Sequence, residues 1–321
     1  MIALVTGVAG FVGSAIARRL LEEGHEVRGI DSVTDYYDVR IKESNLASIS
    51  SEGFTYIPED LNSMDIDTAM RGADFVFHEA GQPGVRKSWG ADFDEYTREN
   101  ISATQKLLES AKRNGNLKKF IYASSSSIYG DAGSYPTSEA ATPAPISPYG
   151  VTKLAAENLC TLYGKNFGVP TVSLRYFTVY GPGQRPDMAF TRFARAAVLD
   201  ETITIFGTGD QVRDFTYIED VVSANVAVAF GDVGPGSVYN VAGGSNISVN
   251  EILDLLADLS GKRLKIEYVD SIPGDVFRTG GSTLKIEEDV GWIPTVSIQE
   301  GIGRQLDWAQ ELYGTRLEIN D

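Results

Sequence analysis

Two residues four positions apart suggest acid–base chemistry in the middle of the chain. Tyr149 and Lys153 follow Ser147 and Pro148, residue types favoured at the N-cap and at the first position of a helix. Because residues at i and i+4 share a helix face, we expect the Lys153 ammonium to lower the pKa of the Tyr149 phenol from about 10. Such a phenol can exchange a proton with a hydroxyl at neutral pH. The alternative is an ordinary exposed pair.

A glycine pattern near the N-terminus could hold an anion. Gly7, Gly10 and Gly13 follow the apolar run of residues 1–5 and open a helical pattern. The first glycine permits a tight turn, the second lets a pyrophosphate approach the backbone, and the third allows close helix packing. The helix N-terminus then attracts the anion. The spacing predicts a dinucleotide site, with a ligand-free turn as the alternative.

The ends of the next predicted strands carry further candidate residues. Asp31 follows residues 26–30, and its carboxylate can bind a ribose diol and repel a 2′-phosphate, which favours NAD over NADP. His78 ends the apolar strand of residues 75–78, and we interpret it as a structural histidine rather than a base. The serine run of residues 124–127 follows the strand of residues 120–123 and is either a solvated loop or a row of hydroxyls over a substrate.

Composition limits the classes of function that the chain can serve. Its 321 residues are 42% apolar and 22% charged, which are ordinary values for a globular protein. This length suits a large α/β domain with a smaller second domain. The net charge of −16 argues against nucleic acid and anionic membranes as partners. The single cysteine, Cys160, excludes an internal disulfide framework. With only two histidines, the chain also has too few ligands for a typical zinc site. Because a strand begins at Met1, we expect no signal peptide and a cytoplasmic location.

The order of the predicted elements indicates the fold class. Further strands at residues 54–57, 172–176 and 237–241, with a helix through Asn100 and Thr104, predict an α/β fold with a doubly wound parallel sheet. The glycine- and proline-rich residues 180–187 are the candidate boundary of a second domain. Beyond it, arginines at 185, 213 and 278 are either surface charges or cations for a diphosphate.

These motifs, taken together, resemble the extended short-chain dehydrogenase/reductases. The resemblance rests on the glycine motif, Asp31, Asp60-Leu61, the serine run and Tyr149-x-x-x-Lys153, and it continues through residues 175–182 and 213–218 to Arg278. Within that group the chain is similar to the nucleotide-sugar 4-epimerases. The resemblance implies a Rossmann-type NAD domain of residues 1–180 plus 216–244, a smaller α/β sugar-nucleotide domain of residues 181–215 plus 245–321, and a homodimer formed by NAD-domain helices.

The resemblance also implies roles for individual residues. Tyr149, Ser125 and Lys153 match the catalytic set, in which the tyrosine takes the C4-hydroxyl proton of a UDP-sugar while NAD accepts the hydride. The matching NAD-binding positions are Gly7, Gly10, Phe11, Val12, Gly13, Asp31, Ser32, Asp60, Leu61, Ala80, Gly81, Gln82, Asn100, Tyr149, Lys153, Tyr176 and Phe177. The matching substrate positions are Arg86, Ser126, Ser127, Thr178, Arg185, Ala189, Phe190, Ile205, Phe206, Gln211, Arg213, Asp275 and Arg278.

Sister activities and the choice of sugar are partly constrained by the same resemblance. Family dehydratases carry Asp-Glu directly after the catalytic hydroxyl residue, where this chain has Ser126 and Ser127. Residues 35–39 with Lys42, and residues 178–189, are more similar to UDP-glucuronate 4-epimerases than to glucose/galactose enzymes. We therefore expect UDP-glucuronate, with UDP-glucose/UDP-galactose as the runner-up and a non-catalytic NAD-binding scaffold as a third hypothesis. Glu79 departs from the apolar residue usual in the family.

Overall fold

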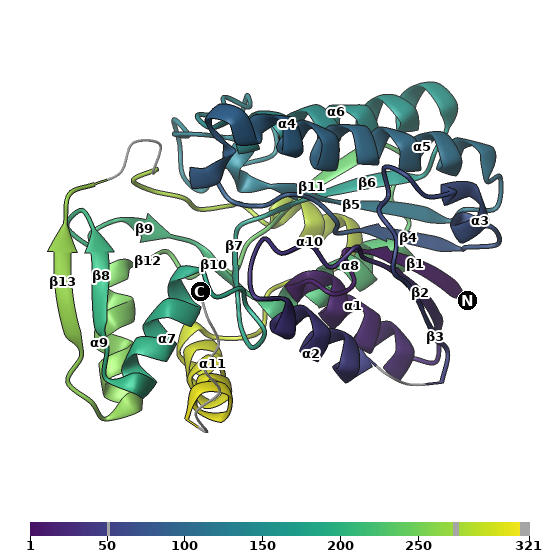
Figure 1. The fold of residues 1–321 in the computed structure, drawn as a ribbon. Helices are drawn as coiled ribbons and strands as arrows, with labels where there is room; N and C mark the ends of the chain where they lie inside the picture. Colours follow the sequence, from purple (N-terminus) through teal and green to yellow (C-terminus); the bar gives the residue numbers. More distant parts are fainter. Residues whose placement is uncertain (50–51, 272–275, 315–321) are drawn as a thin grey trace.

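Seven parallel strands form the centre of the molecule, in the order β11–β6–β5–β4–β1–β2–β3 (Figure 1). The structure, a computed structural model, describes residues 1–49, 52–271 and 276–314. Because all neighbours in this sheet run parallel, the strands must be connected by crossovers, most of which are helices. The strands are β1 (Ile2–Thr6), β2 (Glu26–Ile30), β3 (Phe54–Ile57), β4 (Phe75–His78), β5 (Lys119–Ser125), β6 (Thr171–Tyr176) and β11 (Ser237–Val241).

Helices cover both faces of this sheet. In Figure 1 the helices α4, α5 and α6 lie above it and α1, α2 and α8 lie below it. A short π-helical stretch, Thr97–Ser102, leads into α5 and contains Asn100, which the sequence had predicted in an ordinary helix. The helices are α1 (Phe11–Glu22), α2 (Val39–Ile49), α3 (Ile66–Met70), α4 (Phe93–Tyr96), α5 (Ala103–Arg113), α6 (Pro148–Phe167) and α8 (Ile218–Phe230).

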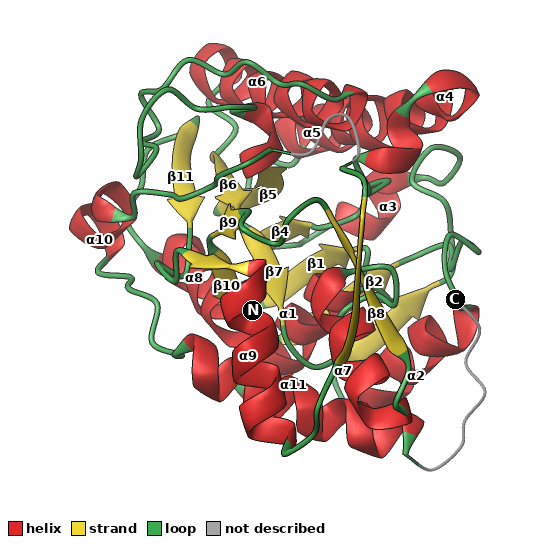
Figure 2. Cartoon of the chain, turned by 90° about the vertical axis from the view of Figure 1, so that its left-hand side faces the viewer, coloured by secondary structure: helices red, strands yellow, loops and turns green. Residues whose placement is uncertain are grey.

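A second group of elements lies beside the carboxyl ends of the strands (Figures 1 and 2). Helix α7 packs against both α9 and α11, and the short parallel pair β8–β13 lies at the outer side of this group. These elements are α7 (Ala189–Leu199), α9 (Val249–Ser260), α11 (Ile298–Tyr313), β8 (Thr202–Phe206) and β13 (Lys265–Val269). Three-residue β7 (Thr178–Tyr180) pairs with β10 (Phe215–Tyr217), two-residue β9 (Val212–Arg213) pairs with β12 (Ile247–Ser248), and α10 (Leu284–Val290) packs on β11.

Two hydrophobic clusters hold these layers together. One fills the sheet face under α5 and α6 and includes Leu107, Phe120 and Cys160. The other fills the opposite face and continues into the second group of helices, where Phe193 and Leu256 belong to the same cluster as Val5. Burial of these apolar side chains is the main force that fixes the second group against the sheet.

The strand order reverses between β1 and β4, which lie next to each other although they are not consecutive. In open α/β sheets such a switch point leaves a crevice at the carboxyl ends of the strands, where ligands bind. The predicted α/β class and the parallel sheet are confirmed. The expected division into two domains stays a prediction. No helix among the described residues is long and apolar enough to cross a membrane.

Candidate active site

A cavity of about 470 Å³ runs along the carboxyl ends of the central strands. Its volume lies within the range of about 300 to 1,000 Å³ that is usual for small-molecule sites. The structure brings most of the predicted site residues to its walls. They are Gly7, Gly10, Phe11, Val12, Gly13, Asp31, Ser32, Asp60, Leu61, Ala80, Gly81, Gln82, Ser125, Ser126, Ser127, Tyr149, Lys153, Tyr176, Phe177, Thr178 and Arg185.

The glycine turn forms one wall because it carries no side chains. Gly7 has a φ of 71°, in the left-handed region that glycine adopts without strain. A Cβ atom on Gly13 would lie only 2.2 Å from the Gly7 carbonyl oxygen, so the close approach of α1 to the turn depends on glycine there. The N-cap residue Gly10 gives α1 no side-chain cap. The first N–H groups of α1 are therefore available to an anion in the cavity.

Two carboxylates lie on the same side of the cavity. Asp31 accepts hydrogen bonds from the Ala9 amide at 3.0 Å and the Val33 amide at 2.8 Å, so it ties the end of β2 to the glycine turn. Its position at a strand end is the one expected for a group that binds a ribose diol. Asp60 accepts from the Asn62 amide at 2.7 Å and pairs with Arg98.

The Tyr149 phenol lies at the start of α6, where the sequence placed it. The Ser147 side chain caps the helix by accepting from the Gly150 amide at 3.1 Å, and Pro148 occupies the first turn. Tyr149 lies close enough to the Ser125 hydroxyl, at the end of β5, for that hydroxyl to lower its pKa. The expected acid–base residue and its hydroxyl partner are thus adjacent, although 24 residues separate them in the chain.

The electrostatics of this pair differ from the sequence-based expectation. The pKa of Tyr149 is raised, because burial outweighs the hydrogen bond from Ser125 and the positive charge of Arg185, both of which lower it. Lys153 instead donates to the Ala123 carbonyl at 2.9 Å. Burial lowers the pKa of Lys153 to about 8, against the opposing charge of Glu79. In the protein alone, the lowered tyrosine pKa that we expected from Lys153 is therefore not found.

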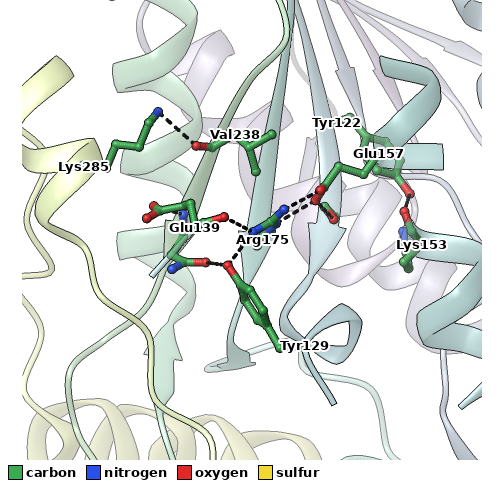
Figure 3. A network of polar contacts seen from close by, with 10 residues as sticks. Tyr122, Tyr129, Glu139, Lys153, Glu157, Arg175, Val238 and Lys285 are labelled. Atoms are coloured by element: carbon green, nitrogen blue, oxygen red, sulfur yellow. Dashed lines mark hydrogen bonds and ion pairs between the residues drawn. The ribbon is translucent and has the colours of Figure 1, made fainter. Parts of the chain in front are cut away.

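A buried polar network fixes the elements behind this pair (Figure 3). Arg175 on β6 donates to both oxygens of Glu157 on α6, at 2.9 and 2.7 Å, and to the Tyr129 hydroxyl at 2.6 Å. Ser124 donates to the same Glu157 carboxylate at 2.6 Å. Of the two readings of the serine run, the solvated loop is therefore wrong, because Ser124 is buried and both Ser124 and Ser125 belong to β5.

Two buried residues support the neighbouring walls. His78 lies between the Thr6 and Thr104 hydroxyls, at 2.8 and 2.9 Å, and burial lowers its pKa to about 3, so it is a neutral structural residue as predicted. Asn100 accepts from the Gln82 amide at 2.7 Å and donates to the Thr152 hydroxyl at 3.0 Å. The Asn100 side chain thus holds the loop after β4 against α6.

Arg185 brings a cation into the cavity from the segment that follows β7. Its Nε and Nη2 atoms each lie 2.9 Å from an Asp187 carboxylate oxygen, and its guanidinium lies 5.7 Å from the centre of the Tyr36 ring. Three polar residues, Ser126, Ser127 and Thr178, line the same cavity. This part of the wall therefore combines the Arg185 guanidinium with several hydroxyl groups.

The remaining predicted substrate residues do not line this cavity, but several lie together. The Arg86 guanidinium lies 4.6 Å from the centre of the Phe206 ring. Arg278 forms an isolated β-bridge with Val212, the residue before Arg213. The first contact connects the loop after β4 with β8, and the second connects β9 with the segment around Arg278.

Four further predicted positions have different surroundings. The side chains of Phe190 and Ile205 are buried in the hydrophobic core, so only their backbone is left to meet a ligand. Ala189 is exposed at the first position of α7. Asp275 lies outside the described residues.

Sequence reasoning named no binding contact for several polar residues that line the cavity, although it used the stretches that contain them to choose the sugar. Tyr36, Tyr37 and Lys42 come from the segment after β2, and Gln184 comes from the segment after β7. Lys42 is buried and donates to the Thr34 carbonyl at 2.7 Å. Tyr36, Tyr37 and Gln184 lie outside helices and strands, and Lys42 lies in α2, so no periodicity predicts that they meet at the cavity.

Comparison with known proteins assigns the chain to a family. Residues 3–242 match the NAD dependent epimerase/dehydratase family. The chain belongs to this family. An epimerase/dehydratase relative from Thermodesulfobacterium geofontis, named UDP-glucuronate 4-epimerase, is 39% identical over 315 residues, 96% of each chain. A Bacillus subtilis protein named uncharacterized UDP-glucose epimerase YtcB is 40% identical over 312 residues, 97% of this chain and 98% of its own.

A solved structure extends the likeness to the whole fold. The Bacillus cereus UDP-glucuronic acid 4-epimerase in complex with UDP-glucuronic acid and NAD is 42% identical, with a TM-score of 0.94 over 98% of this chain and all of that one. Like other members of the epimerase/dehydratase family, the chain is NAD-dependent. The walls fit that cofactor, since the N-terminus of α1, which has no side-chain cap, and Asp31 at the end of β2 both line the cavity.

Proposed function

We propose that this member of the epimerase/dehydratase family inverts C4 of a UDP-sugar through a transient 4-keto sugar. The observation that carries the proposal is that Tyr149 and the Ser125 hydroxyl, which lowers the Tyr149 pKa, line the same cavity as the glycine turn and Asp31. A proton acceptor and a hydroxyl group are thereby combined with a site for an oxidant. The intact set of Tyr149, Ser125 and Lys153 argues against a non-catalytic scaffold.

The chain's own residues supply the proton transfer. When bound, NAD accepts a hydride from C4 and later returns it to the opposite face of the sugar. Tyr149 removes the C4-hydroxyl proton, while Ser125 keeps that hydroxyl aligned. Both Ser125 and Arg185 lower the pKa of Tyr149 and so favour the phenolate that must form. Tyr149 then returns the proton to the product, and the cycle consumes no oxidant.

Water elimination is a less suitable reaction for this site. An eliminating enzyme of the resembling group carries two acidic residues next to its catalytic hydroxyl, and this chain has Ser126 and Ser127 there. Both serines line the cavity and offer only hydroxyl groups. Epimerisation needs no further acid or base, so it agrees better with these side chains.

We propose UDP-glucuronate as the preferred substrate, in agreement with the names of two relatives. Arg185 supports this choice because its guanidinium lines the cavity and its positive charge lowers the pKa of Tyr149. Asp187 occupies Nε and Nη2, which leaves Nη1 for a sugar carboxylate. Thr178, Ser126 and Ser127 add hydroxyl donors, and each such hydrogen bond contributes roughly 1 to 3 kcal/mol.

We further propose that the nucleotide end of the substrate lies between β8 and β9. The Gln211 Oε1 atom is buried and has no hydrogen-bond partner among the described residues, an arrangement that a ligand donor would complete. Arg213 and Arg278 lie near each other there through the bridge from Val212. This placing agrees with the proposed sugar-nucleotide domain of residues 181–215 plus 245–321 and an NAD domain of residues 1–180 plus 216–244.

A substrate comparison tests the proposal and its runner-up. UDP-glucuronate and UDP-galactose are each incubated with wild type, Arg185→Ala and the exposed control Arg192→Ala, and the C4 epimers are then separated. We expect UDP-glucuronate to be preferred by wild type and by the control, and Arg185→Ala to lose activity mainly on UDP-glucuronate. A wild-type preference for UDP-galactose would support the glucose/galactose alternative. No conversion of any UDP-hexose or UDP-hexuronate would support a scaffold.

We also propose that the protein forms a homodimer and is located in the cytoplasm. Helix α6 carries Leu162 and Phe167, which are 51% and 55% exposed, on the side of the sheet where α5 and α6 lie. Such apolar side chains are typical of a protein interface when they occur together. The buried, unpaired thiol of Cys160 is consistent with a reducing compartment.

A further inference from the structure

Glu79 is a carboxyl group that the proposed reaction does not use, although it lines the same cavity. It follows β4 directly, at the switch point of the sheet. A Cβ atom on Gly7 would lie 2.7 Å from the Ala80 amide nitrogen and 3.0 Å from the Glu79 carbonyl carbon, so this turn touches the glycine turn. Glu79 therefore lies between the proposed pyrophosphate site and the Tyr149 end.

One hydrogen bond orients the Glu79 side chain. The Tyr176 hydroxyl donates to Glu79 Oε1 at 3.1 Å and accepts from Asn225 Nδ2 at 2.8 Å. Asn225 in turn donates to the Val221 carbonyl within α8 at 2.9 Å. Tyr176 is the register partner of Ser125 on β5. The Glu79 carboxyl is thus held at the end of the cavity where the proposed proton transfer occurs.

The charged and titratable groups around Glu79 come from three elements. Lys153 on α6 is the cation, and the Tyr176 and Tyr122 phenols face it from β6 and β5. The adjacent His78 is neutral and bonded to two threonines. Burial raises the pKa of Glu79 to about 7, although Tyr176 and Lys153 both lower it, so the carboxyl changes charge near neutral pH.

We infer that the ionised Glu79 carboxylate makes the site select the oxidised, positively charged cofactor over the reduced one. The inference rests on the proposed function, which puts the nicotinamide beside the carbon whose hydroxyl Tyr149 deprotonates. Nicotinamide loses its positive charge when it accepts a hydride, so a nearby negative charge stabilises the oxidised form selectively. Return of the hydride is thereby favoured. The 4-keto sugar, a β-keto acid when it derives from glucuronate, is then short-lived.

Linkage gives the inference a quantitative consequence. If ionisation of Glu79 favours NAD over NADH by about tenfold, the Glu79 pKa must be about one unit lower in the NAD complex than in the NADH complex. The preference for NAD must therefore grow as pH rises through the titration of Glu79. This dependence distinguishes an ionising carboxyl from a side chain that only fills space.

The test measures binding rather than turnover. Dissociation constants of NAD and NADH are determined for wild type, Glu79→Gln and Glu79→Leu between about pH 6 and about pH 7.5, below the pKa of about 8 of Lys153. Glu79→Gln keeps an acceptor for the Tyr176 hydroxyl, and Glu79→Leu removes it. Glu59→Gln is the matched control, because Glu59 is an exposed carboxylate on the wall of the same cavity.

We expect the ratio of the NADH constant to the NAD constant to rise several-fold with pH in wild type and in Glu59→Gln. In both Glu79 variants the ratio should be nearly constant with pH, close to the wild-type ratio at about pH 6 and several-fold smaller than the wild-type ratio at about pH 7.5. Equal ratios in wild type and the two Glu79 variants, with normal nucleotide binding, would overturn this inference and leave the proposed function standing. Failure of wild type to bind either nucleotide would overturn both.

Discussion

At the scale of residues, Tyr149 needs its surroundings to act as a base. Burial raises its pKa, whereas the Ser125 hydrogen bond and the Arg185 charge lower it. Lys153 donates to the Ala123 carbonyl and is not among the groups that lower this pKa. Since positive charge near a phenol favours the phenolate, a cationic cofactor at this end of the cavity would shift the balance toward the active form.

Replacing Tyr149 by phenylalanine removes a single oxygen atom. Tyr149→Phe should reduce kcat at least about a thousandfold, because several kcal/mol of barrier lowering depend on the proton acceptor. The melting temperature and the NAD dissociation constant should stay near the wild-type values. Steady-state kinetics with thermal unfolding check this, and turnover close to wild type would exclude Tyr149 as the base.

Glu79 should make stability depend on pH in the protein without nucleotide. Its pKa is raised from 4.5 to about 7, so the folded protein binds this proton more tightly than the unfolded chain. The stabilisation is complete below about pH 4.5 and is lost as the pH rises to about 7. Glu79→Gln should therefore be more stable than wild type at about pH 8, by about 2 kcal/mol after allowance for partial exposure, and the gain should shrink toward pH 5. Unfolding curves at the two pH values measure this, and an equal gain at both would contradict the raised pKa.

At the scale of elements, the predicted bounds of four strands, β2, β3, β4 and β11, are confirmed. The bounds of β1, β5 and β6 differ by one or two residues, because buried polar residues such as Thr6, Ser124 and Thr171 extend these strands beyond their apolar runs. The π-helical stretch at Thr97–Ser102 was missed, since no sequence period marks it. The sequence also did not show that Ser124 belongs to β5. Its hydroxyl donates to the buried Glu157 carboxylate, which is distant in sequence.

The Arg175–Glu157 pair joins β6 to α6 in the interior (Figure 3). Arg175→Met should lower the free energy of unfolding by about 3 to 5 kcal/mol, because it leaves a buried carboxylate unpaired. Adding Glu157→Leu should restore much of that loss. Arg304→Met, which breaks an exposed pair, is the control and should cost about 1 kcal/mol or less. Denaturant unfolding distinguishes these cases; equal losses in Arg175→Met and the double variant would show that the charge is not the cause.

At the scale of the molecule, sequence reasoning predicted the cavity residues that belong to recognisable motifs. It did not predict contacts between segments that are distant in sequence. The glycine turn, Asp31 and Tyr149 were found because each belongs to a short pattern. Tyr36 and Lys42 were used only to choose the sugar and not as contacts, since only the path of the chain after β2 brings them to the wall. The contact of Arg86 with Phe206 likewise joins segments far apart in sequence, which no local pattern predicts.

The exposed apolar side chains of α6 predict that two copies of the protein associate through this helix. Leu162→Glu should shift the protein from dimer to monomer, because it buries a charge in the proposed interface. Ile266→Glu, on the distant strand β13 and 39% exposed, is the matched control and should leave the mass unchanged. Light scattering during size-exclusion chromatography measures both masses. A wild-type monomer, or a dimer that survives Leu162→Glu, would contradict the proposed interface.

The central claim is that C4 is oxidised and then reduced by the same hydride within one closed site. The direct measurement uses UDP-glucuronate that carries deuterium at C4, with NAD-loaded wild-type enzyme in ordinary water. We predict UDP-galacturonate that keeps the deuterium at C4 and no accumulation of NADH. Loss of the deuterium to solvent, or NADH formed in proportion to product, would contradict the account.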